Sequence, residues 1–558
     1  MSADKTQAVV AKEYFSNAQK LQAEGQIAEA IACYRKTLEL QPDWSWVHHA
    51  LGDSLVRQGK LEEAIVCYRK ATELQPDLPW SYHSLASTLV QQGKLEEAVA
   101  SYRKAIELKP DLTASYHSLG GVLERQNKFE DASDCYRKAI EIAPNQIATY
   151  TPLVRVLFKL GKAEEAIRYY CQGIELNPDD LQLHFTLACG CFDRGHIDKA
   201  FDGYLKCIQL DPTHLNSYLR LQHIPMNQSR LDKAITCLRE VIDKQPSSPY
   251  AHSALARALT KQGDIDAAIM SLKIASRQQV IKLRPDLSTI DWNTAQSRAP
   301  DFMVIGSAKA GTTSLYDYLV QHPLVLPSVE KELHFFSAAY GSNINRYTNA
   351  IDLYLAHFPP VPSEAKFITG EATPNYLDYC SIPGKYFDIE KQVFKHFPNV
   401  KLIVILRNPV SRTYSAYNHG VTYARERRAF RDAIEFEFEI LNSIQTPLNL
   451  LDVKLQEYPA FYLINSMYFY FLKKWMDIFP KEQFLILKFE QLCSEPFQTM
   501  TKVFDFLNLP SHSLSSYKKR NEGRYNPIDK NLKIILSDFF RVHNKKLENF
   551  LDIKFDWE

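Results

Sequence analysis

The sequence predicts two structural classes in one chain: an all-α array of repeated helix pairs, followed by an α/β domain with a parallel sheet. Two observations carry this prediction. Residue types recur every 34 positions over the first half of the chain, and the recurrence stops after about Val280. Beyond that point, short apolar runs each lead into a polar loop and then a helix-like segment. This is the arrangement expected of buried parallel strands and their crossovers.

The repeat is marked by three residue types at constant spacing. A proline follows each second helix, at Pro42, Pro76, Pro110, Pro144, Pro178, Pro212 and Pro246. The same spacing carries an alanine from Ala30 to Ala268 and a leucine from Leu51 to Leu255. A small residue, a leucine and a helix-ending proline at fixed offsets describe one helix–turn–helix unit. Such a unit buries its apolar face only by stacking on its neighbours, so the sequence predicts a helical solenoid.

The period and the residue types resemble the tetratricopeptide repeat (TPR). We expect about eight units over residues 11–282, with residues 1–10 as a tail. The unit that starts at Leu215 departs most, because Pro225 lies inside its first helix and should kink it. The resemblance implies a concave groove that holds a protein or peptide ligand.

Histidines and tryptophans recur within the first helices of the early units. His49, His83 and His117 occupy one repeat position, and Trp46 and Trp80 lie three residues earlier, hence on the same helical face. If this face lines the groove, it suits an extended polar ligand or sugars that stack on indoles. Alternatively, the tryptophans pack between helices and the histidines are only solvated. Both interpretations remain open from the sequence.

Composition limits the remaining classes. A chain of 558 residues exceeds one core, and a formal charge of +1 argues against a nucleic-acid binder built on bulk charge. The first residues are polar, and no run of about 18 apolar residues occurs, so we expect no membrane span and a cytoplasmic location. The ten cysteines show no CxxC or histidine-paired spacing. We therefore expect no metal site and no disulfides.

The second domain is expected over residues 300–558, after a linker at 283–299. Its first apolar run, 301–305, leads into a loop of small residues and then a helix. The loop and the helix start comprise Gly306, Ser307, Ala308, Lys309, Ala310, Gly311, Thr312, Thr313 and Ser314. Backbone N–H groups at such a helix start bind phosphate-like anions. A Walker A loop needs lysine directly after its last glycine, but here Thr312 follows Gly311 and Lys309 precedes it, which disfavours a kinase or NTPase.

This loop resembles the 5′-phosphosulfate loop of sulfotransferases, nearest to the heparan sulfate sulfotransferase type and its bacterial relatives. The resemblance implies that 3′-phosphoadenylyl sulfate (PAPS) is the sulfuryl donor. It also implies that Lys309, which stabilises the leaving group, and the donor-binding residues Ala310, Gly311, Thr312, Thr313 and Ser314 hold it.

Two downstream strings extend the resemblance. The string from Lys331 to Phe336 resembles the family segment that supplies the catalytic base, which implies that Glu332 takes the acceptor's proton. His334 either orients the acceptor or satisfies a buried hydrogen bond. A second apolar run at 401–406 precedes Arg407 and a helix with Ser415, which resembles the family's 3′-phosphate site.

Four further expectations concern this second domain. Arg412 and Tyr417 are assigned to the surface and to packing. The string 521–527 resembles a loop that closes over the nucleotide, which makes Gly523 and Arg524 candidate donor ligands. At 371–372 the chain has glutamate and alanine where the heparan-type enzymes have a glutamate–lysine pair. We expect Glu371 to line the cleft, whereas the missing lysine argues against a heparan-like acceptor.

The resulting prediction is a PAPS-dependent sulfotransferase that needs no metal. Its acceptor would be a hydroxyl or amine of a glycan or protein, and the repeats would recruit that acceptor or a partner. Two alternatives remain: a P-loop kinase, and a repeat scaffold whose second domain only binds nucleotide. The sequence leaves the acceptor and the choice between O- and N-sulfation open.

Overall fold

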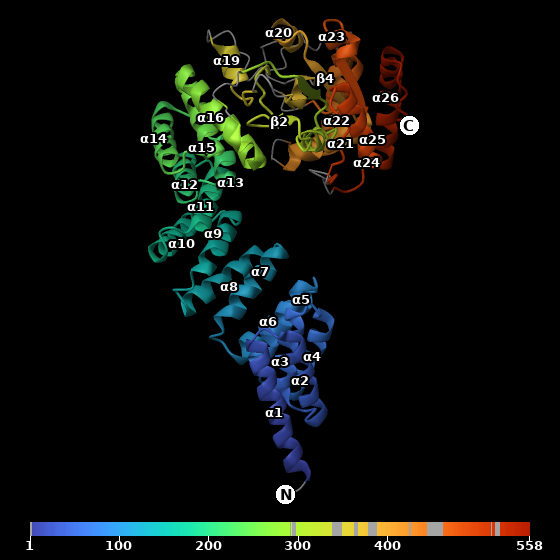
Figure 1. Cartoon of the computed structure of the whole chain (residues 1–558). Helices are drawn as coiled ribbons and strands as arrows, with labels where there is room; N and C mark the ends of the chain where they lie inside the picture. The colour runs from blue at the N-terminus through green and yellow to red at the C-terminus, as the bar shows by residue number, and fades with distance from the viewer. Residues whose placement is uncertain are drawn as a thin grey trace. The chain divides into compact units, whose positions relative to one another are not determined.

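A computed structural model describes residues 3–290, 292, 297–337, 349–361, 366–377, 388–422, 426–443, 461–514, 516–518 and 525–557. The chain forms two compact units, Met1–Pro225 and Met226–Glu558 (Figure 1). The first unit is built from helices alone within its described residues, whereas the second combines further helices with a parallel sheet. The predicted fold classes of the N-terminal and C-terminal regions are confirmed.

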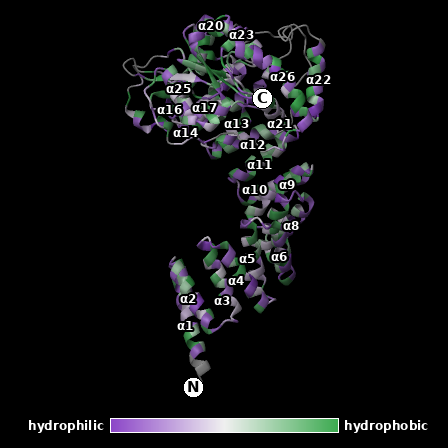
Figure 2. Ribbon diagram, turned by 90° about the vertical axis from the view of Figure 1, so that its right-hand side faces the viewer, coloured by the Kyte–Doolittle hydropathy of each residue, from purple (hydrophilic) through white to green (hydrophobic). Residues whose placement is uncertain are grey.

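Successive helices of the first unit form the predicted helix–turn–helix pairs. They are α1 (Ala3–Ala23), α2 (Ile27–Leu40), α3 (Ser45–Arg57), α4 (Leu61–Leu74), α5 (Pro79–Gln91), α6 (Leu95–Leu108), α7 (Thr113–Arg125), α8 (Phe129–Ile142), α9 (Tyr150–Lys159), α10 (Ala163–Leu176), α11 (Leu181–Asp193), α12 (Ile197–Leu210) and α13 (Leu215–Leu221). The repeated alanines, such as Ala30 and Ala64, have no exposed surface, because neighbouring helices approach closely there. Figure 2 shows apolar and polar residues on different sides of these helices, as stacking requires.

The expected kink at Pro225 is wrong, because α13 ends four residues earlier, at Leu221. A proline has no N–H to donate to the carbonyl four residues before it, and its ring clashes with that carbonyl. The helix therefore stops instead of bending. The next helix, α14 (Gln228–Lys244), belongs to the second unit, together with α15 (Pro249–Gln262) and α16 (Ile265–Leu283).

His49, His83 and His117 connect successive repeats through hydrogen bonds. Neither interpretation of the sequence included this arrangement. Nδ1 lies 3.0 Å from a hydroxyl of the next repeat in the pair His49–Ser81, and the equivalent distance is 2.9 Å in His83–Ser115 and 3.1 Å in His117–Thr149. Each imidazole also packs edge-on against a tyrosine of its own repeat. Burial lowers the pKa of all three histidines, which favours the neutral ring.

The two tryptophans are not packed between helices. Trp46 is 41% exposed and Trp80 is 43% exposed. The ring of Trp46 stacks on His49, with 5.1 Å between centroids, and Lys109 lies 5.1 Å from the centroid of Trp80. The indoles therefore remain accessible on the repeat surface.

The second unit contains a five-stranded sheet among its described residues. The strands are β1 (Phe302–Gly306), β2 (Val325–Pro327), β3 (Ile368–Glu371), β4 (Lys401–Leu406) and β5 (Phe484–Lys488). They pair in parallel in the order β2-β3-β1-β4-β5. From β1 the chain continues to one side of the sheet, and from β4 it continues to the other. In open parallel sheets, ligands bind beyond the carboxyl ends of such neighbouring strands.

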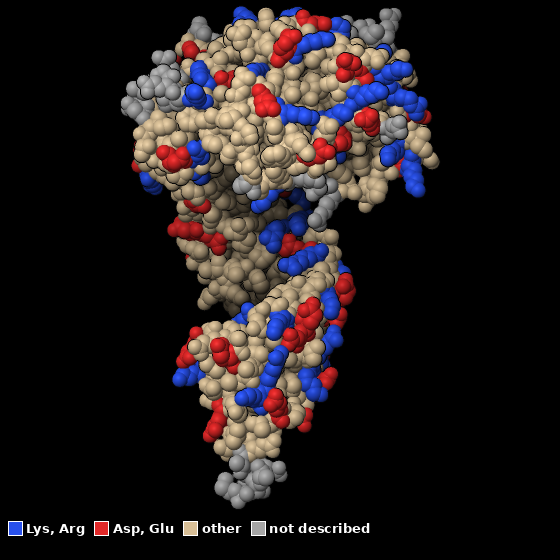
Figure 3. Space-filling view, turned by 45° about the vertical axis from the view of Figure 1, so that its right-hand side comes forward, with Lys and Arg blue, Asp and Glu red and all other residues tan. Residues whose placement is uncertain are grey.

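Helices surround this sheet (Figure 1). They are α17 (Thr312–Leu319), α19 (Ala350–Leu355), α20 (Ile389–His396), α21 (Pro409–Thr422), α22 (Phe430–Ser443), α23 (Tyr468–Met476), α24 (Phe489–Ser494), α25 (Pro496–Phe506) and α26 (Lys530–Leu551). Within the described part of the chain, no helix is both long and apolar enough to cross a membrane. Basic and acidic side chains are interspersed on the face that Figure 3 shows, in keeping with the small net charge.

The last repeat helices pack on the sheet within the second unit. Val280 of α16 and the buried residues Leu287 and Trp292 form an apolar cluster with Leu326 and Val361. The indole N–H of Trp292 donates to the carbonyl of Leu287 at 3.2 Å. The segment predicted as a linker thus contributes buried side chains to the core of this unit.

A glycine pair in α7 tests the packing of the repeats. A Cβ on Gly120 would lie 2.7 Å from the ring of Tyr136, whereas a Cβ on Gly121 would meet only the Tyr136 hydroxyl, at 3.7 Å. We expect Gly120→Ala to destabilise the protein by roughly 1–3 kcal/mol through overpacking. Gly121→Ala should stabilise it by up to about 1 kcal/mol, because alanine favours a helix interior.

Thermal unfolding of the full chain, followed by circular dichroism at helix wavelengths, measures both variants. Equal shifts of the midpoint in the two variants would contradict the close contact between α7 and Tyr136.

Candidate active site

The loop after β1 depends on a glycine at the start of α17. Gly311 caps the helix with φ of 90°, a left-handed conformation that favours glycine. A Cβ there would lie 2.8 Å from the ring of Phe489, so space as well as backbone conformation excludes a side chain. Lys309 also adopts a positive φ, of 67°. The loop thereby turns tightly from β1 into α17. The first backbone N–H groups of α17 are directed toward this loop.

Positive charge gathers at this loop. The Nη1 of Arg407, which follows β4, donates to the carbonyl of Lys309 at 3.0 Å. The Nε of Arg412, from α21, donates to the carbonyl of Ala308 at 3.1 Å. Burial lowers the pKa of the Lys309 amine, and the charges of both arginines lower it further. Three basic side chains that repel one another across a partly buried loop form a site suited to a ligand with several negative charges.

Arg412 is a core residue, so its assignment to the surface is wrong. Its side chain is 2% exposed, and its Nη1 donates to the carbonyl of Tyr462 at 3.1 Å. The hydroxyl of Thr413 donates to the same carbonyl at 3.2 Å. The buried guanidinium of Arg412 thus donates to carbonyls of two different segments. It joins the loop after β1 to the turn at Tyr462, which is distant in the sequence. Tyr417, by contrast, packs as predicted, against the cluster that contains Val410 and Tyr462.

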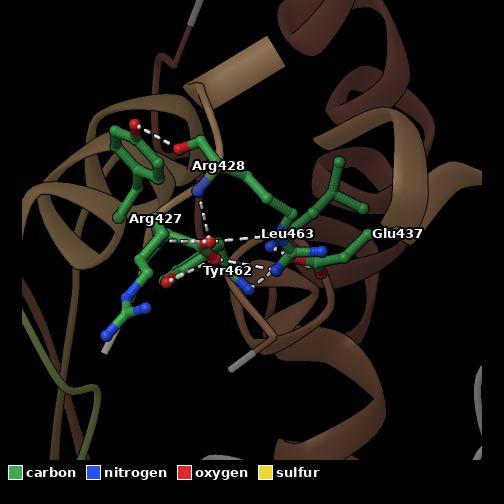
Figure 4. Close-up of polar contacts among 7 residues, drawn as sticks. Arg427, Arg428, Glu437, Tyr462 and Leu463 are labelled. Atoms are coloured by element: carbon green, nitrogen blue, oxygen red, sulfur yellow. Dashed lines mark hydrogen bonds and ion pairs between the residues drawn. The ribbon is translucent and has the colours of Figure 1, made fainter. Parts of the chain in front are cut away.

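Two buried glutamates hold that distant turn (Figure 4). The carboxylate of Glu437 accepts three backbone N–H groups, from Tyr462 at 2.6 Å, Leu463 at 2.9 Å and Ile464 at 3.1 Å. Burial raises the pKa of Glu437 to about 7, although these donors oppose the rise. Glu426 accepts from the Tyr462 hydroxyl at 3.2 Å and pairs with Arg428 at 2.7 Å. The turn that receives Arg412 is therefore fixed from two sides.

Ser415 lies on the second turn of α21 and is 4% exposed. Its hydroxyl lies 3.3 Å from that of Tyr525, and the Tyr414 hydroxyl donates to the carbonyl of Asn526 at 2.8 Å. The segment that directly follows residues 519–524 therefore contacts α21. The predicted donor ligands Gly523 and Arg524 lie outside the described residues.

The candidate base is held by two neighbours in sequence. Glu332 pairs with Lys331 at 2.5 Å through Oε1 and lies 3.4 Å from the Nε2 of His334 through Oε2. Burial raises the pKa of Glu332, but hydrogen bonds and charges from His334 and Lys331 outweigh it and lower the pKa to about 2. Lys331 Nζ also donates to the Thr313 hydroxyl at 2.9 Å, which links the base to the first turn of α17. His334 contacts the base directly.

Glu371 is fully buried, so the expectation that it lines the cleft is wrong. Its carboxylate accepts hydroxyl hydrogen bonds from Tyr354 at 2.6 Å, Thr373 at 2.5 Å and Tyr376 at 3.2 Å. Burial raises its pKa. Thr373 in turn accepts from the backbone N–H of His334 at 3.3 Å, so Glu371 supports the base segment from behind.

Several of the residues predicted from the sequence lie near one another beyond the carboxyl ends of β1 and β4. The structure brings Lys309, Arg407, Glu332 and His334 to the loop and its immediate neighbours. The sequence interpretation missed Lys331, although it stands next to Glu332 in the chain. Among the described residues, no group of three or more histidines, cysteines or carboxylates could hold a metal ion.

Comparisons with known families and proteins agree with this geometry. The family model described as "Sulfotransferase domain" matches residues 299–541. Models described as TPR or tetratricopeptide repeats match residues 52–93, 86–127, 114–146, 148–180 and 226–275.

The chain is also similar to individual known proteins. The chain is similar to "Membrane-associated sulfotransferase kil1" of Dictyostelium discoideum, at 26% identity over 329 residues, covering 46% of this chain and 66% of that protein. It is also similar to "Bifunctional heparan sulfate N-deacetylase/N-sulfotransferase 3" of Homo sapiens, at 29% identity over 286 residues, covering 46% of this chain and 30% of that protein. The chain thus spans less than two thirds of either relative's length. The solved "Crystal Structure of Sulfotransferase from Alicyclobacillus acidocaldarius" is 26% identical with a TM-score of 0.35, covering 46% of this chain and 96% of that one.

The close fit at Gly311 yields a test of the anion site. Gly311→Ala should weaken the binding of adenosine 3′,5′-bisphosphate about tenfold or more, because the strained residue and its contact with Phe489 displace the loop. Gly263→Ala is the matched control: its φ of 98° is equally strained, but a Cβ there has no atom within 4 Å. Calorimetric titration measures both affinities. Equal losses of affinity in the two variants would contradict a binding role for the loop.

Proposed function

We propose that this chain, which carries TPR repeats in its N-terminal region and a sulfotransferase domain in its C-terminal region, transfers a sulfuryl group from PAPS to an acceptor hydroxyl or amine. One observation supports this most strongly. Lys309 and Arg407 meet at a helix-starting loop, and Lys331 joins that loop to the carboxylate of Glu332. The site thus combines an anion-binding region with an adjacent proton acceptor.

The positive charges at the loop suit this donor. Lys309 and the amides of Ala310 to Ser314 would hold its 5′-phosphosulfate, and Arg407 with Ser415 would hold its 3′-phosphate. The donor supplies an activated sulfuryl group whose departure leaves negative charge on the nucleotide. Lys309 would stabilise that charge in a partly buried site, where electrostatic interactions are stronger than in water.

Glu332 would receive the acceptor's proton. With its pKa lowered to about 2, the carboxylate is ionised at neutral pH but is a weak base toward a free hydroxyl. We infer that proton transfer occurs late, once the attacking atom has lost electron density and its proton has become acidic. His334 and Lys331 keep the carboxylate turned toward the loop during this step.

The acceptor class is a glycan or a protein, and the TPR repeats would recruit it or a partner. The human relative is named as a heparan sulfate N-sulfotransferase, so de-N-sulfated heparan belongs among the acceptors to test. Ala372 is buried in the apolar cluster that contains Phe302 and Ile403. The lysine of the heparan-type enzymes has no counterpart at this position. We propose the cytoplasm as the location, because the spacing of the ten cysteines indicates no disulfide framework.

The reaction class is tested by supplying two labelled donors. Incubation with sulfur-labelled PAPS should label an acceptor from a panel of glycans, tyrosine peptides and small phenols, whereas γ-labelled ATP should label none. Labelling from ATP would support the kinase alternative. Binding of adenosine 3′,5′-bisphosphate without any transfer would support the scaffold alternative.

Lys309→Ala should abolish sulfuryl transfer while the fold persists. Loss of a cation aimed at the developing charge should raise the barrier by about 3 kcal/mol or more. Initial rates at saturating PAPS measure the effect, and Lys391→Ala on the exposed face of α20 serves as the control. A near-normal rate for Lys309→Ala would exclude this role.

Glu332→Gln should retain donor affinity and lose turnover by roughly 100-fold, because glutamine cannot accept the proton. The measurement combines kcat with the calorimetric affinity for adenosine 3′,5′-bisphosphate, and Glu482→Gln is the control because Glu482 lies in a turn with no buried residues. Normal turnover together with lost nucleotide affinity would assign Glu332 to donor binding instead.

A further inference from the structure

A repeat helix contacts the segment that carries the candidate base. We call residues 328–334 the base segment. The Nη2 of Arg257, on α15, donates to Oε1 of Glu330 at 2.5 Å. The hydroxyl of Ser253, one turn earlier on the same helix, donates to the same oxygen at 2.7 Å. Both contacts lie within the second compact unit, and Glu330 stands two residues before Glu332.

The contact belongs to a larger interface inside this unit. The apolar cluster of Val280, Leu287 and Trp292 with Leu326 and Val361 lies between the repeat end and the sheet. Polar contacts accompany it: Arg284 donates to the carbonyl of Pro323 at 3.0 Å, and Asn349 donates to Asp266 at 3.0 Å. The repeat helix that carries Arg257 is therefore fixed to the sheet by contacts other than the Arg257–Glu330 pair.

The charges around Glu330 favour a stable ion pair. Burial raises its pKa, but the Arg257 charge and the Ser253 hydrogen bond outweigh this, so the pKa of Glu330 is lowered. His357 also faces the pair, and burial lowers its pKa, which keeps the ring neutral near neutral pH. Lys261, one turn beyond Arg257, has its pKa lowered by burial and by that arginine. The Glu330 side chain is partly buried, and removal of Arg257 would leave its carboxylate without its main charged partner.

Further hydrogen bonds hold the backbone of the base segment around Glu330. The Ser328 hydroxyl donates to the carbonyl of Glu330 at 2.6 Å. The backbone N–H of Ala372 donates to the carbonyl of Lys331 at 3.0 Å, and that of Val329 donates to the carbonyl of His357 at 2.9 Å. Only Lys331 separates Glu330 from Glu332, so a displacement of Glu330 would move the backbone that leads into Glu332.

We propose that Arg257 and Ser253 of the repeat helix α15 are positioning residues for Glu332, acting through Glu330. This inference rests on the proposed function, because it assigns these residues to the orientation of its base. The repeat helices α15 and α16 are then part of the catalytic unit. A base that is displaced by a few tenths of an ångström to 1 Å loses much of its effect. Arg257 and Ser253 would therefore influence turnover.

The first experiment measures the base segment itself and needs no acceptor. Amide hydrogen exchange, followed by mass spectrometry on the full chain, compares wild type with Arg257→Ala and Glu330→Gln. Both variants should increase exchange in the peptide 328–337 severalfold and leave 306–314 unchanged. Arg284→Ala is the matched control, because it removes another contact between the repeat end and the sheet without touching Glu330. It should leave 328–337 unchanged.

The second experiment separates positioning from general stability. With PAPS and de-N-sulfated heparan or p-nitrophenol as acceptor, Arg257→Ala should lower kcat about tenfold, with the KM for PAPS and the affinity for adenosine 3′,5′-bisphosphate unchanged. Arg257→Lys should restore part of kcat. The double variant Arg257→Ala with Glu330→Gln should be no worse than either single variant, because both remove one interaction.

The outcomes distinguish failure of the positioning role from failure of the proposed function. Unchanged exchange in 328–337 for Arg257→Ala, or kcat within twofold of wild type while Glu332→Gln is inactive, would overturn the positioning role and leave the proposed function intact. Normal turnover in both Lys309→Ala and Glu332→Gln would instead overturn the proposed function. A loss of kcat and nucleotide affinity together in Arg257→Ala would show a merely structural role and would also overturn the inference.

Discussion

The parallel pairing of β1 with β4 is the contact on which the rest of the candidate site depends. Phe302 pairs with Lys401 and Val304 with Ile403, and the backbone N–H of Ser307 continues the pairing by donating to the carbonyl of Ile405 at 2.8 Å. Because both strands end at the same edge of the sheet, Arg407 reaches the loop that follows β1. A slip of one residue would move Arg407 by about 3.3 Å and turn the buried strand faces over. The anion site therefore follows from strand register.

Buried carboxyl groups fix the loops that this register brings together. Glu371 binds three hydroxyls at the end of β3, and Glu437 binds three backbone N–H groups at the turn that receives Arg412. A buried carboxyl group without hydrogen bonds is costly, so each of these arrangements is stable only when complete. The geometry of the site thus depends on fully buried groups around it.

Local patterns in the sequence predicted the parts of the site that are local in the chain. Strand, small-residue loop and helix start are contiguous, so Lys309 and Arg407 could be identified from their strings alone. The burial of Arg412 could not, because its partner Tyr462 lies 50 positions away in sequence. The pair of Arg257 with Glu330 joins residues 73 positions apart and belongs to no repeated pattern. Such contacts depend on how helices pack on the sheet, which periodicity does not encode.

The same distinction applies to the fold. The 34-residue period predicted the helix pairs, since each pair repeats a local pattern. Pro225 was expected to bend a helix, but local stereochemistry ends α13 at Leu221 instead. Glu371 was expected in a cleft because it stands where the heparan-type enzymes have the glutamate of a glutamate–lysine pair. Only the surrounding tyrosines, which come from two separate segments, explain its burial.

The links between histidine and hydroxyl residues in the early repeats have a consequence for the growth of the array. Each link joins positions 32 residues apart and recurs with the 34-residue period, in His49–Ser81, His83–Ser115 and His117–Thr149. Excision or insertion of one whole period among these repeats would therefore re-form the same link between new neighbours. The joint is interchangeable, so the number of repeats can change by recombination without any compensating substitution at the junction.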